Sequence, residues 1–513
     1  MAASMRLADL LASVSLLSDL GFALPPEESM RSCIIATALS RRIGLAEADV
    51  SDVFYTALLQ HLGCTGFAHE TAAVYGNELV VNAAAARMDS DDVGDVVAFM
   101  RAATRSKGLA GRARVIAYTL VRGSAWGRRF ATARCEVGRE TARRLGLSEG
   151  VRRGLHEAAE SWNGKEGVRG LRGEAISVAA RIATLAATAS RFHDIGGEEA
   201  VIDALRHRSG TALDPSMVSM FIEHASEILA EAGNGDPRDV LLAAEPAPVR
   251  AVSEALLADV AVAIADVADL KSVHTLGHSS QVAALATGAA TDMDLDDAAA
   301  SRLQVAALLH DLGRVGVSTS IWERAGPLTA AEWEQVRLHA YHSERILARS
   351  DVLRPMAIIA GMHHERLDGS GYHRGSRGRE IPVEARILAA ADAFQAMTQE
   401  RPHRRAIASE QAAEHLNDDV RAGRLDGDAT RAVIDAAGIK LHGRIRGAAP
   451  AGLSDREIEI LRLMARGLSN REIAARLVVS PRTAEHHVQH IYTKIGTSSR
   501  AAAALFAMEH DVL

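Results

Sequence analysis

Apolar residues recur at helical spacing along most of this chain, and this feature most narrows its possible folds. Val260, Ala263, Ile264 and Val267 occupy positions i, i+3, i+4 and i+7 of one such stretch, which places them on one face of an α-helix. The alternation of apolar and polar residues that marks a half-buried strand is scarce. Aromatic residues make up only 4% of the chain, whereas alanine, leucine and valine are abundant. The sequence therefore predicts an all-α fold whose helices pack through small side chains.

The length of the chain and its breaker residues predict three domains. The chain has 513 residues, and one domain commonly takes about 100–200 residues. Two segments are rich in glycine or proline and poor in periodic pattern, Gly233–Arg250 and Gly438–Gly452, and we interpret both as linkers. We therefore expect domains over residues 1–235, 250–437 and 450–513.

Cysteine usage, apolar stretches and net charge exclude several classes of protein. The three cysteines lie far apart without a CxxC spacing, which excludes a disulfide framework and a cysteine-rich zinc site. Long apolar stretches such as Ala255–Ala268 are interrupted by Asp259 and Asp266, so we expect no membrane span and a cytoplasmic location. A net charge of −7 argues against a nucleic-acid coat but permits one local DNA-binding module.

The first two predicted domains look like copies of each other. The segment LLQHLG at Leu58–Gly63 matches LLHDLG at Leu308–Gly313, 250 residues later. Leu171–Phe192 matches Ser376–Met397 at a spacing of 205 residues. The matches keep their order, so the first copy must hold 45 extra residues between them. The alternative is that alanine-rich helical sequences resemble one another by composition alone.

The second predicted domain carries histidines and aspartates that suit a metal site. The chain has 21 histidines, and five of them lie with two aspartates in or beside apolar helical stretches. Adjacent residues on a helix point about 100° apart, so a doublet cannot lie wholly in the core, but at a helix end it can present two ligands to one pocket. Neutral imidazoles bind Mn, Fe, Co, Ni or Zn, and one carboxylate can bridge two ions. The set exceeds what one tetrahedral zinc needs and predicts two divalent ions: His278, His310, Asp311, His339, His363, His364 and Asp392.

These residues lie in segments that resemble successive motifs of the HD-GYP family of HD-domain metal-dependent phosphohydrolases. The segments are GHSSQVAALA, LLHDLGRVGV, LHAYHSERIL, MHHERLDGSGY and ARILAAADAFQAMTQERPHR, and the match spans about His274–Gly438. The resemblance implies an all-helical domain with two or three metal ions, such as Fe or Mn, that hydrolyses a phosphodiester of cyclic diguanylate. It implies that the seven side chains are the ligands, with Asp311 bridging. His274 stands where some members carry a ligand for a third ion, and we favour a surface histidine there.

The chain departs from the family pattern at several positions. Arg314 replaces a usual lysine, and because a guanidinium keeps its proton at neutral pH we expect it to contact phosphate, not to donate a proton. The resemblance places Arg314, Asp368, Gly371 and Tyr372 at the substrate and Asp311 and Arg314 at the reaction centre. The usual Gly-Tyr-Pro reads Gly371-Tyr372-His373, which puts substrate specificity in doubt. We expect Gly369 and Gly371 to supply the positive φ that such a loop needs.

The first predicted domain lacks most of these ligands. At the two spacings, His278 corresponds to Glu28, and His310-Asp311 corresponds to Gln60-His61. The doublet His363-His364 and Asp392 correspond to alanines at 158, 159 and 187. Too few ligands remain for two ions, so this part resembles an HD domain that has lost catalysis. It is either a sensory or regulatory pocket or a packing partner for the second domain.

The last 61 residues predict a DNA-binding module. Ser454 with Glu457, and Ser469 with Glu472, form two capping boxes, and Ser480 caps a third helix that begins with Pro481. Gly467 and Gly496 end the first and third helices. This layout is a helix-turn-helix, and the segments LSDREIEIL, GLSNREIA and TAEHHVQHIYTKIG resemble the LuxR-type module, which binds double-stranded DNA as a dimer. The matching positions imply contacts to bases or phosphates from Ser480, Arg482, Thr483, Glu485, His486, Gln489 and Lys494.

Two functional hypotheses follow. The first is a metal-dependent phosphodiesterase that acts on cyclic diguanylate or a related nucleotide and is coupled to a DNA-binding tail, most simply as a homodimer. The second is a transcription factor without catalysis that uses the pocket to sense a nucleotide. The complete ligand set favours the enzyme, whereas Arg314 and the Gly-Tyr-His variation favour the sensor.

Overall fold

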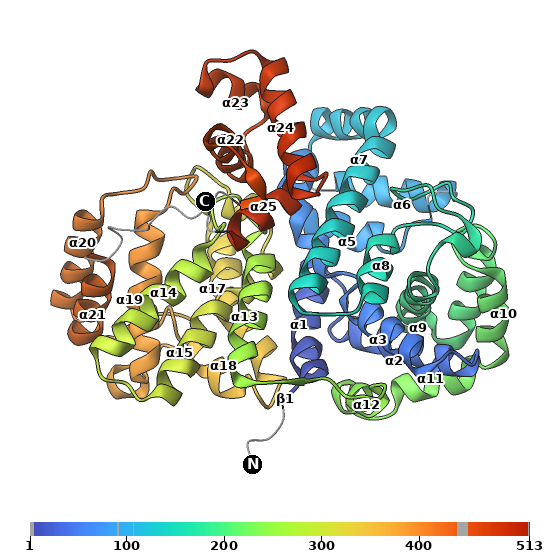
Figure 1. Ribbon diagram of the computed structural model, residues 1–513, viewed down its shortest axis with the longest axis horizontal. Coiled ribbons are helices and arrows are strands. Elements are labelled where there is room, and N and C mark those ends of the chain that lie inside the picture. Colours follow the sequence, from blue (N-terminus) through green and yellow to red (C-terminus); the bar gives the residue numbers. More distant parts are fainter. Residues whose placement is uncertain (1–4, 90–91, 106, 439–449, 511) are drawn as a thin grey trace. The chain divides into compact units, whose positions relative to one another are not determined.

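The chain is almost wholly helical in the computed structural model, which describes residues 5–89, 92–105, 107–438, 450–510 and 512–513 (Figure 1). Two compact units divide it, Met1–Ser253 and Glu254–Leu513. The strands among the described residues are β1 (Met5–Arg6) and β2 (Ala251–Val252), which pair antiparallel within the first unit. The all-α prediction is confirmed, and so is the predicted face on 260–267, since Val260, Ala263, Ile264 and Val267 are at most 3% exposed.

The first unit packs α2, α3 and α9 around a core that includes the fully buried Phe54 and Tyr55. Its helices are α1 (Leu7–Gly21), α2 (Glu28–Arg42), α3 (Glu47–Leu59), η1 (Leu62–Phe67), α4 (Ala68–Tyr75), α5 (Glu78–Ala85), α6 (Val93–Thr104), α7 (Leu109–Arg144), α8 (Glu149–Glu157), η2 (Gly173–Ala175), α9 (Val178–Arg208), α10 (Pro215–Glu223), α11 (Ala225–Gly233) and α12 (Pro237–Ala244).

The segment that we interpreted as the first linker contains a helix at Pro237–Ala244, so that interpretation is wrong for those residues. Helix α12 begins at Pro237, and the Asp236 side chain accepts a hydrogen bond from the Arg238 amide at 2.9 Å. Proline suits the first helical turn, and aspartate is a good N-cap. The helix packs on α1 and α2, so this stretch belongs to the first unit. The second interpreted linker, Gly438–Gly452, lies largely outside the described residues.

The second unit contains the predicted metal-binding region and the tail. Its helices are α13 (Glu254–Asp269), α14 (His278–Asp292), α15 (Asp297–Leu309), η3 (Leu312–Gly316), α16 (Thr319–Trp322), α17 (Ala330–Ala348), α18 (Arg354–Gly361), η4 (Gly378–Glu380), α19 (Val383–Thr398), α20 (Ser409–Arg421), α21 (Gly427–Gly438), η5 (Pro450–Gly452), α22 (Asp455–Ala465), α23 (Asn470–Leu477), α24 (Pro481–Ile495) and α25 (Arg500–Glu509).

A close crossing of the chain recurs in both units and supports the predicted repeat. A Cβ on Gly63 would overlap the Arg134 carbonyl oxygen, and a Cβ on Gly313 would overlap the His339 carbonyl oxygen. Gly63 and Gly313 are 250 residues apart, whereas Arg134 and His339 are 205 apart. The 45 extra residues therefore lie between Gly63 and Arg134. This stretch includes α4 to α6, which form a hydrophobic cluster around Tyr75 and Phe99 together with Val115 of α7.

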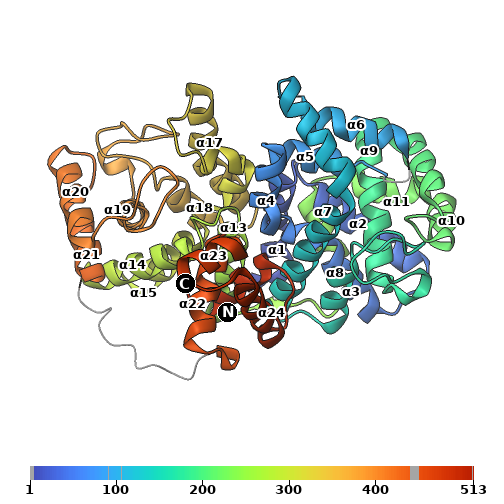
Figure 2. The ribbon, with the colours of Figure 1, turned by 90° about the horizontal axis from the view of Figure 1, so that it is seen from above.

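The tail begins its first three helices where the sequence predicts. Both capping boxes are present, at Ser454 with Glu457 and at Ser469 with Glu472, and the Ser480 hydroxyl accepts a hydrogen bond from the Thr483 amide at 3.0 Å. The prediction missed a fourth helix, α25, whose alanine-rich face is buried against α22. Figure 2 shows α22, α23 and α24 gathered into one bundle.

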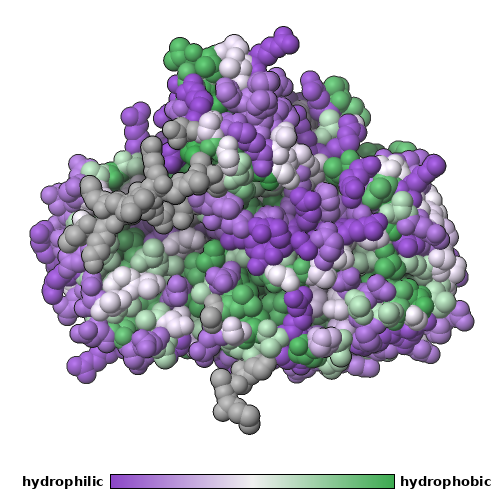
Figure 3. Space-filling model, viewed as in Figure 1, coloured by the Kyte–Doolittle hydropathy of each residue, from purple (hydrophilic) through white to green (hydrophobic). Residues whose placement is uncertain are grey.

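The surface and the helix lengths are relevant to the expectation that the chain has no membrane span. On the face drawn in Figure 3, polar and apolar surface residues are interspersed. Within the described ranges, no helix combines the length and the apolar character that crossing a bilayer requires.

Candidate functional site

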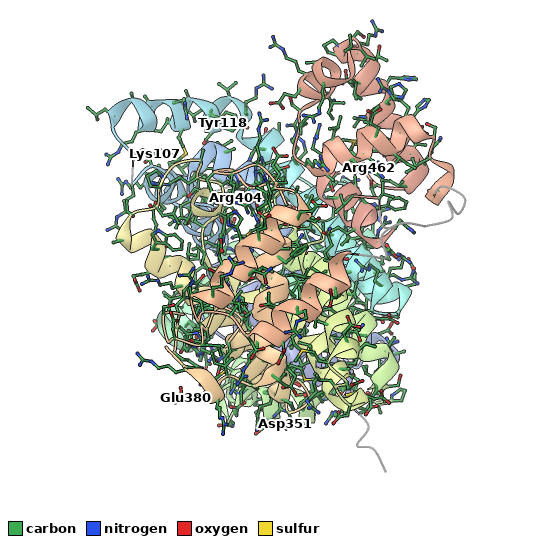
Figure 4. The ribbon with its side chains drawn as sticks, turned by 90° about the vertical axis from the view of Figure 1, so that its left-hand side faces the viewer. Lys107, Tyr118, Asp351, Glu380, Arg404 and Arg462 are labelled. Atoms are coloured by element: carbon green, nitrogen blue, oxygen red, sulfur yellow. The ribbon has the colours of Figure 1, made fainter. Side chains whose placement is uncertain are left out.

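Five helices and their ends bring the seven predicted side chains of the second unit together. His278 is the first residue of α14, and the His310-Asp311 doublet stands where α15 gives way to η3. The His363-His364 doublet follows the end of α18, so both doublets lie at helix ends, as predicted. The remaining two lie inside helices: His339 in α17 and Asp392 in α19. Glu380 and Arg404, which Figure 4 labels, precede and follow α19 in the chain.

The Asp311 carboxylate stands between two groups of side chains. Its Oδ2 lies 3.5 Å from the Nε2 atoms of both His278 and His310. Its Oδ1 lies 3.3 Å from Nε2 of His339 and 3.7 Å from Nε2 of His363. Each carboxylate oxygen thus faces a different pair of imidazoles, which is the arrangement that a bridging carboxylate needs.

Asp392 and His364 complete the two groups. Asp392 Oδ1 lies 3.2 Å from Nε2 of His278 and 3.7 Å from Nε2 of His310. His364 joins His339 and His363 in a set whose ligand atoms all lie within 4.8 Å of one another. Six of the seven residues are at most 7% exposed, whereas the His364 side chain is 21% exposed. The cluster is therefore buried and opens towards solvent at His364.

Hydrogen bonds orient three of the five imidazoles so that their Nε2 atoms point inward. Nδ1 of His310 donates to the Ala307 carbonyl at 2.7 Å, and Nδ1 of His363 donates to the Ala360 carbonyl at 2.6 Å. Nδ1 of His339 bonds the Val336 carbonyl in the same way. Each imidazole thus bonds the carbonyl three residues earlier in the chain. Such bonds at Nδ1 fix the ring and leave Nε2 as the ligand atom.

The buried cluster fits divalent metal ions. The Nε2 atoms of His278 and His310 are buried without a hydrogen-bond partner, and a buried polar atom without a partner is costly. A metal ion bound there would supply the missing partner. The donors are imidazole nitrogens and carboxylate oxygens, a set suited to Mn, Fe, Co or Zn.

Electrostatics keep the carboxylates ionised and most imidazoles neutral. Burial alone would raise the pKa of Asp311, but Arg314 and the neighbouring imidazoles hold that pKa well below its usual range. Burial lowers the pKa of His363 to about 3, with further lowering by His310 and His339. His310 differs, because Asp311 and Asp392 outweigh its burial and raise its pKa to about 9. Ionised carboxylates and neutral imidazoles are the forms that bind metal.

The predicted substrate residues fall in different places. The Arg314 Nη1 donates to Asp311 Oδ2 at 2.7 Å, and its guanidinium lies 4.1 Å from the Trp322 ring centre. Tyr372 lies at the site, with its ring centroid 4.7 Å from that of His364. Asp368 is exposed and accepts a hydrogen bond from the Ser370 amide at 2.9 Å. Among these side chains the structure therefore brings Arg314 and Tyr372 to the His/Asp cluster.

The two loop glycines have different roles, so part of our prediction is wrong. Gly369 has a φ of +81°, as predicted, whereas Gly371 has no positive φ. Gly371 is needed for a close approach, because a Cβ there would come within 2.5 Å of the His364 carbonyl oxygen. His373, which replaces the family's proline, has Nε2 3.5 Å from Glu344 Oε2. His274 is half-buried and belongs to none of the metal-binding groups among the described residues.

Sequence reasoning missed two residues that contact the cluster. The Gln395 side chain bonds Nδ1 of His278 and donates to Gln281 at 3.1 Å. The Arg401 Nη2 lies 3.5 Å from Nδ1 of His278, and burial lowers the pKa of Arg401 to about 10. Gln395 lies one helical turn after Asp392, so that spacing could have indicated it. Arg401 follows α19 in a loop, where no periodic pattern reports burial.

Most of the predicted DNA-contacting side chains are exposed on or before α24. The exposed residues are Ser480, Arg482, Thr483, Glu485, His486 and Gln489. The buried face of the same helix carries Ala484, Val488 and Ile491, so the exposed residues have the spacing of one helix surface. Lys494 is also exposed, but its Nζ donates to Glu457 Oε2 at 2.7 Å and to the Gly452 carbonyl at 3.0 Å.

Comparison with known protein families matches two regions of the second unit. Residues 263–429 match the family described as "HD domain". Residues 451–507 match the family described as "Bacterial regulatory proteins, luxR family". The first match contains all seven residues of the His/Asp cluster, and the second contains the four tail helices except the end of α25.

Curated relatives extend the likeness to most of the chain. The chain is 32% identical over 411 residues to 3′3′-cGAMP-specific phosphodiesterase 3 of Vibrio cholerae, which covers 79% of this chain and 89% of that protein. It is 39% identical over 138 residues to a cyclic di-GMP phosphodiesterase of Thermotoga maritima, which covers 26% of this chain and 38% of that protein. The first alignment is longer than the second unit, so it extends into the first unit.

A solved structure shares the fold of both units. The crystal structure of a cyclic GMP-AMP-specific phosphodiesterase of Vibrio cholerae has a TM-score of 0.59 and 28% sequence identity, and the match covers 85% of this chain and 99% of that one. Together with the family matches and the buried His/Asp cluster, this likeness identifies the chain. It belongs to the HD-GYP family of HD-domain, metal-dependent phosphohydrolases and carries a LuxR-type helix-turn-helix domain at its C-terminal end.

Proposed function

We propose that the second unit binds two divalent metal ions and hydrolyses a phosphodiester bond of a cyclic dinucleotide. The observation that carries the proposal is the position of Asp311, with one carboxylate oxygen facing each of two imidazole pairs. His278, His310 and Asp392 would hold one ion, and His339, His363 and His364 the other. Bound there, a metal pair activates a water molecule and neutralises the charge of a transferring phosphoryl group.

The residues of the chain have separate tasks in this reaction. Asp311 keeps the two groups at a fixed separation, because one rigid carboxylate contacts both. Arg314 keeps Asp311 ionised, and its guanidinium, which donates to Asp311 through Nη1, would also contact a phosphate oxygen. Tyr372 stands beside His364, where the cluster opens to solvent, and contacts the part of the substrate nearest that opening. Because Asp368 is exposed and turned to its own loop, we give it no contact with the substrate.

We propose 3′3′-cGAMP as the first substrate to test, with cyclic diguanylate as the second. The relative whose alignment covers 79% of this chain is named for the first nucleotide, whereas the alignment with the cyclic di-GMP relative covers 26%. The purified chain, loaded with Mn²⁺ or Fe²⁺, should convert its substrate to a linear dinucleotide, measured by chromatography. The Asp311→Ala variant is the control. If the unmodified chain shows no turnover of either nucleotide above that control, the protein is a sensor and not an enzyme.

We also propose that the tail binds double-stranded DNA as a dimer on a two-fold site, with the exposed face of α24 in the major groove. The support is the match to the luxR family and the exposure of Glu485, His486 and Gln489. Footprinting with the full chain should show protection of a specific site. Variants His486→Ala and Gln489→Ala should each lose about 1–3 kcal/mol of binding at their base positions. A footprint that persists after deletion of residues 450–513 would refute this assignment.

We propose that the metal site and the tail are coupled within the second unit. The Gly277 amide, which immediately precedes His278, donates to Sδ of Met508 on α25 at 3.3 Å. Occupancy of the site by a cyclic dinucleotide should therefore change the affinity for DNA, by about 5- to 150-fold if the coupling has an ordinary size. Titration of operator DNA with and without the nucleotide measures the change. The Met508→Ala variant should reduce it, and equal affinities in both conditions for the unmodified chain would exclude coupling.

A further inference from the structure

The first unit places arginine where the second unit places a metal-binding histidine. Gly63 packs against the Arg134 carbonyl and the Gly138 amide, just as Gly313 packs against the His339 carbonyl and the Ser343 amide. Arg134 therefore occupies the position of His339. The Arg134 Nη2 donates to the Ala158 carbonyl at 3.2 Å, and Ala158 is the counterpart of His363. The Arg134 guanidinium thus lies at the place that corresponds to the second imidazole group.

A second arginine meets the counterparts of two other metal-binding residues. The Arg191 Nη2 donates to Nε2 of His61 at 3.1 Å, and its Nε lies 3.9 Å from Oε1 of Glu28. His61 is the counterpart of Asp311, and Glu28 is the counterpart of His278. The Glu28 carboxylate also accepts a hydrogen bond from Ser190 at 2.8 Å, the position that corresponds to Gln395. Arg134, Arg191, His61 and Glu28, called the arginine pocket below, thus replace the metal site.

The arginine pocket carries more positive than negative charge. Among the described residues, Glu28 is the one carboxylate within ion-pair distance of Arg191, and Arg134 has none. The neighbouring thiols add no negative charge, because burial raises the pKa of Cys64 to about 12 and also raises that of Cys135. Burial, together with the two arginines, lowers the pKa of His61 well below its usual value, so His61 stays neutral. The pocket therefore contains two guanidinium ions and one carboxylate, which lies near Arg191.

Hydrogen-bond donors in the arginine pocket lack acceptors. Because Nε2 of the neutral His61 accepts from Arg191, its Nδ1 carries the proton, and this buried atom has no partner. The Arg134 Nε and the Arg191 Nε are also buried without a hydrogen-bond partner. The His61 ring stacks on Phe22, with ring centroids 5.2 Å apart, which holds its orientation. A buried charge and buried donors without partners are each costly, and an oxyanion beside the two guanidinium groups would give the Arg134 and Arg191 donors an acceptor.

We propose that the arginine pocket binds a phosphate-bearing ligand, held by Arg134 and Arg191. Guanidinium groups suit phosphate because their N–H groups form a planar fork that matches two oxygens. The Arg191 side chain is 15% exposed and Arg134 is half-buried, so part of each side chain reaches the surface. Free phosphates and nucleotides share this chemistry. The first unit is therefore a binding domain for phosphate oxygens, in which guanidinium ions stand where the second unit has its proposed metal ligands.

Equilibrium dialysis tests this pocket with the metal site disabled. The full-length Asp311→Asn variant in a metal chelator is incubated with radiolabelled pyrophosphate and, separately, with labelled 3′3′-cGAMP. Saturable binding near one molecule per chain, displaced by orthophosphate, is expected for at least one probe. Preferential binding of pyrophosphate indicates free phosphates as the ligand class, and preferential binding of the dinucleotide indicates nucleotides. No saturable binding of either probe overturns the proposal.

Substitutions in the same background assign the binding to the arginine pocket. Arg134→Gln should raise the dissociation constant at least tenfold, because it removes both a charge and a forked donor. Arg134→Lys keeps the charge and should raise the dissociation constant less. This variant also serves if the glutamine variant fails to fold. Arg128→Gln on the exposed side of the same helix is the matched control and should leave binding unchanged. Binding that neither Arg134 variant weakens, or that orthophosphate does not displace, places the ligand elsewhere and overturns the proposal.

Discussion

In the first unit the Ser29 hydroxyl donates to the buried Asp19 at 2.6 Å, and in the second unit the Ser279 hydroxyl donates to the buried Asp269 at 2.8 Å. The two pairs are 250 residues apart. A second shared device lies near the loops: the Glu160 carboxylate accepts the Arg169 and Leu171 amides, as the Glu365 carboxylate accepts the Arg374 and Ser376 amides. The scaffolds of the two units therefore agree in detail.

The centres of the two scaffolds differ in chemistry. In the second unit His310 presents a buried Nε2 to two carboxylates, whereas its counterpart Gln60 donates to Ser32 at 3.1 Å. The hydrogen bonds and close contacts that hold the helices lie apart from the central side chains. The centre can therefore change from imidazoles and carboxylates to guanidinium ions without loss of the fold.

The largest expected difference between the units is in catalysis. His310→Ala removes a predicted metal ligand and should lower the rate of dinucleotide hydrolysis by about 1,000-fold or more, since metal activation supplies several kcal/mol. Gln60→Ala, its counterpart in the first unit, should leave the rate within about twofold. Steady-state hydrolysis by both variants measures this contrast. Equal losses would mean that the first unit takes part in the reaction.

The close backbone contact that both units share should be equally sensitive to substitution of its glycine in each unit. Gly63→Ala and Gly313→Ala each force a Cβ against a backbone carbonyl oxygen, and each should cost about 3 kcal/mol of unfolding free energy. Urea denaturation of each variant measures the loss. Gly44→Ala has open space around its Cβ but a φ of +76°, so it controls for backbone strain alone, and a loss as large as in the other two would contradict the packing explanation.

Removal of metal should lower the stability of the second unit but not that of the first. If free metal stands at about 100 times its dissociation constant, binding adds about 2.7 kcal/mol to stability. This corresponds to a rise of several degrees in the unfolding midpoint of a domain of this size, at about 2–4 °C per kcal/mol. Calorimetry of the full chain before and after chelation should show the fall, and the Asp311→Asn variant should show none. A fall of the same size in that variant would place the stabilising metal outside the cluster.

The smallest effect is the acid sensitivity of the first unit. Burial holds the folded pKa of His61 well below 6.5, so the unfolded chain takes up a proton that the folded chain does not. Stability is therefore retained above about pH 6.5 and falls by about 1.4 kcal/mol per pH unit below it. The His61→Gln variant should lose less stability between pH 7.5 and pH 5.5 than the unmodified chain in urea titrations. Identical pH dependences would remove His61 as the titrating group.

The sequence predicted the local structure well wherever a short pattern carries the information. Serine with glutamate three residues later marked the starts of α22 and α23, because a capping box involves only neighbouring residues. The ordered His/Asp motifs indicated the cluster before any geometry was known. The sequence pattern did not predict α12, where Asp236 and Pro237 begin a helix inside a stretch of apparent breakers. It also did not predict α25, whose alanine-rich sequence resembles many other segments.

Residue types and their spacing thus determined the helical class, the duplication and the seven metal-binding candidates, because helix propensity, capping and ligand chemistry are properties of a few neighbouring residues. Only the tertiary structure decided that Asp311 stands between two imidazole pairs and that Asp368 is exposed and bonded within its own loop. The same holds for the entry of Arg134 and Arg191 into the centre of the first unit. These facts depend on how distant helices pack, and burial of unpaired charge arises only once they have packed.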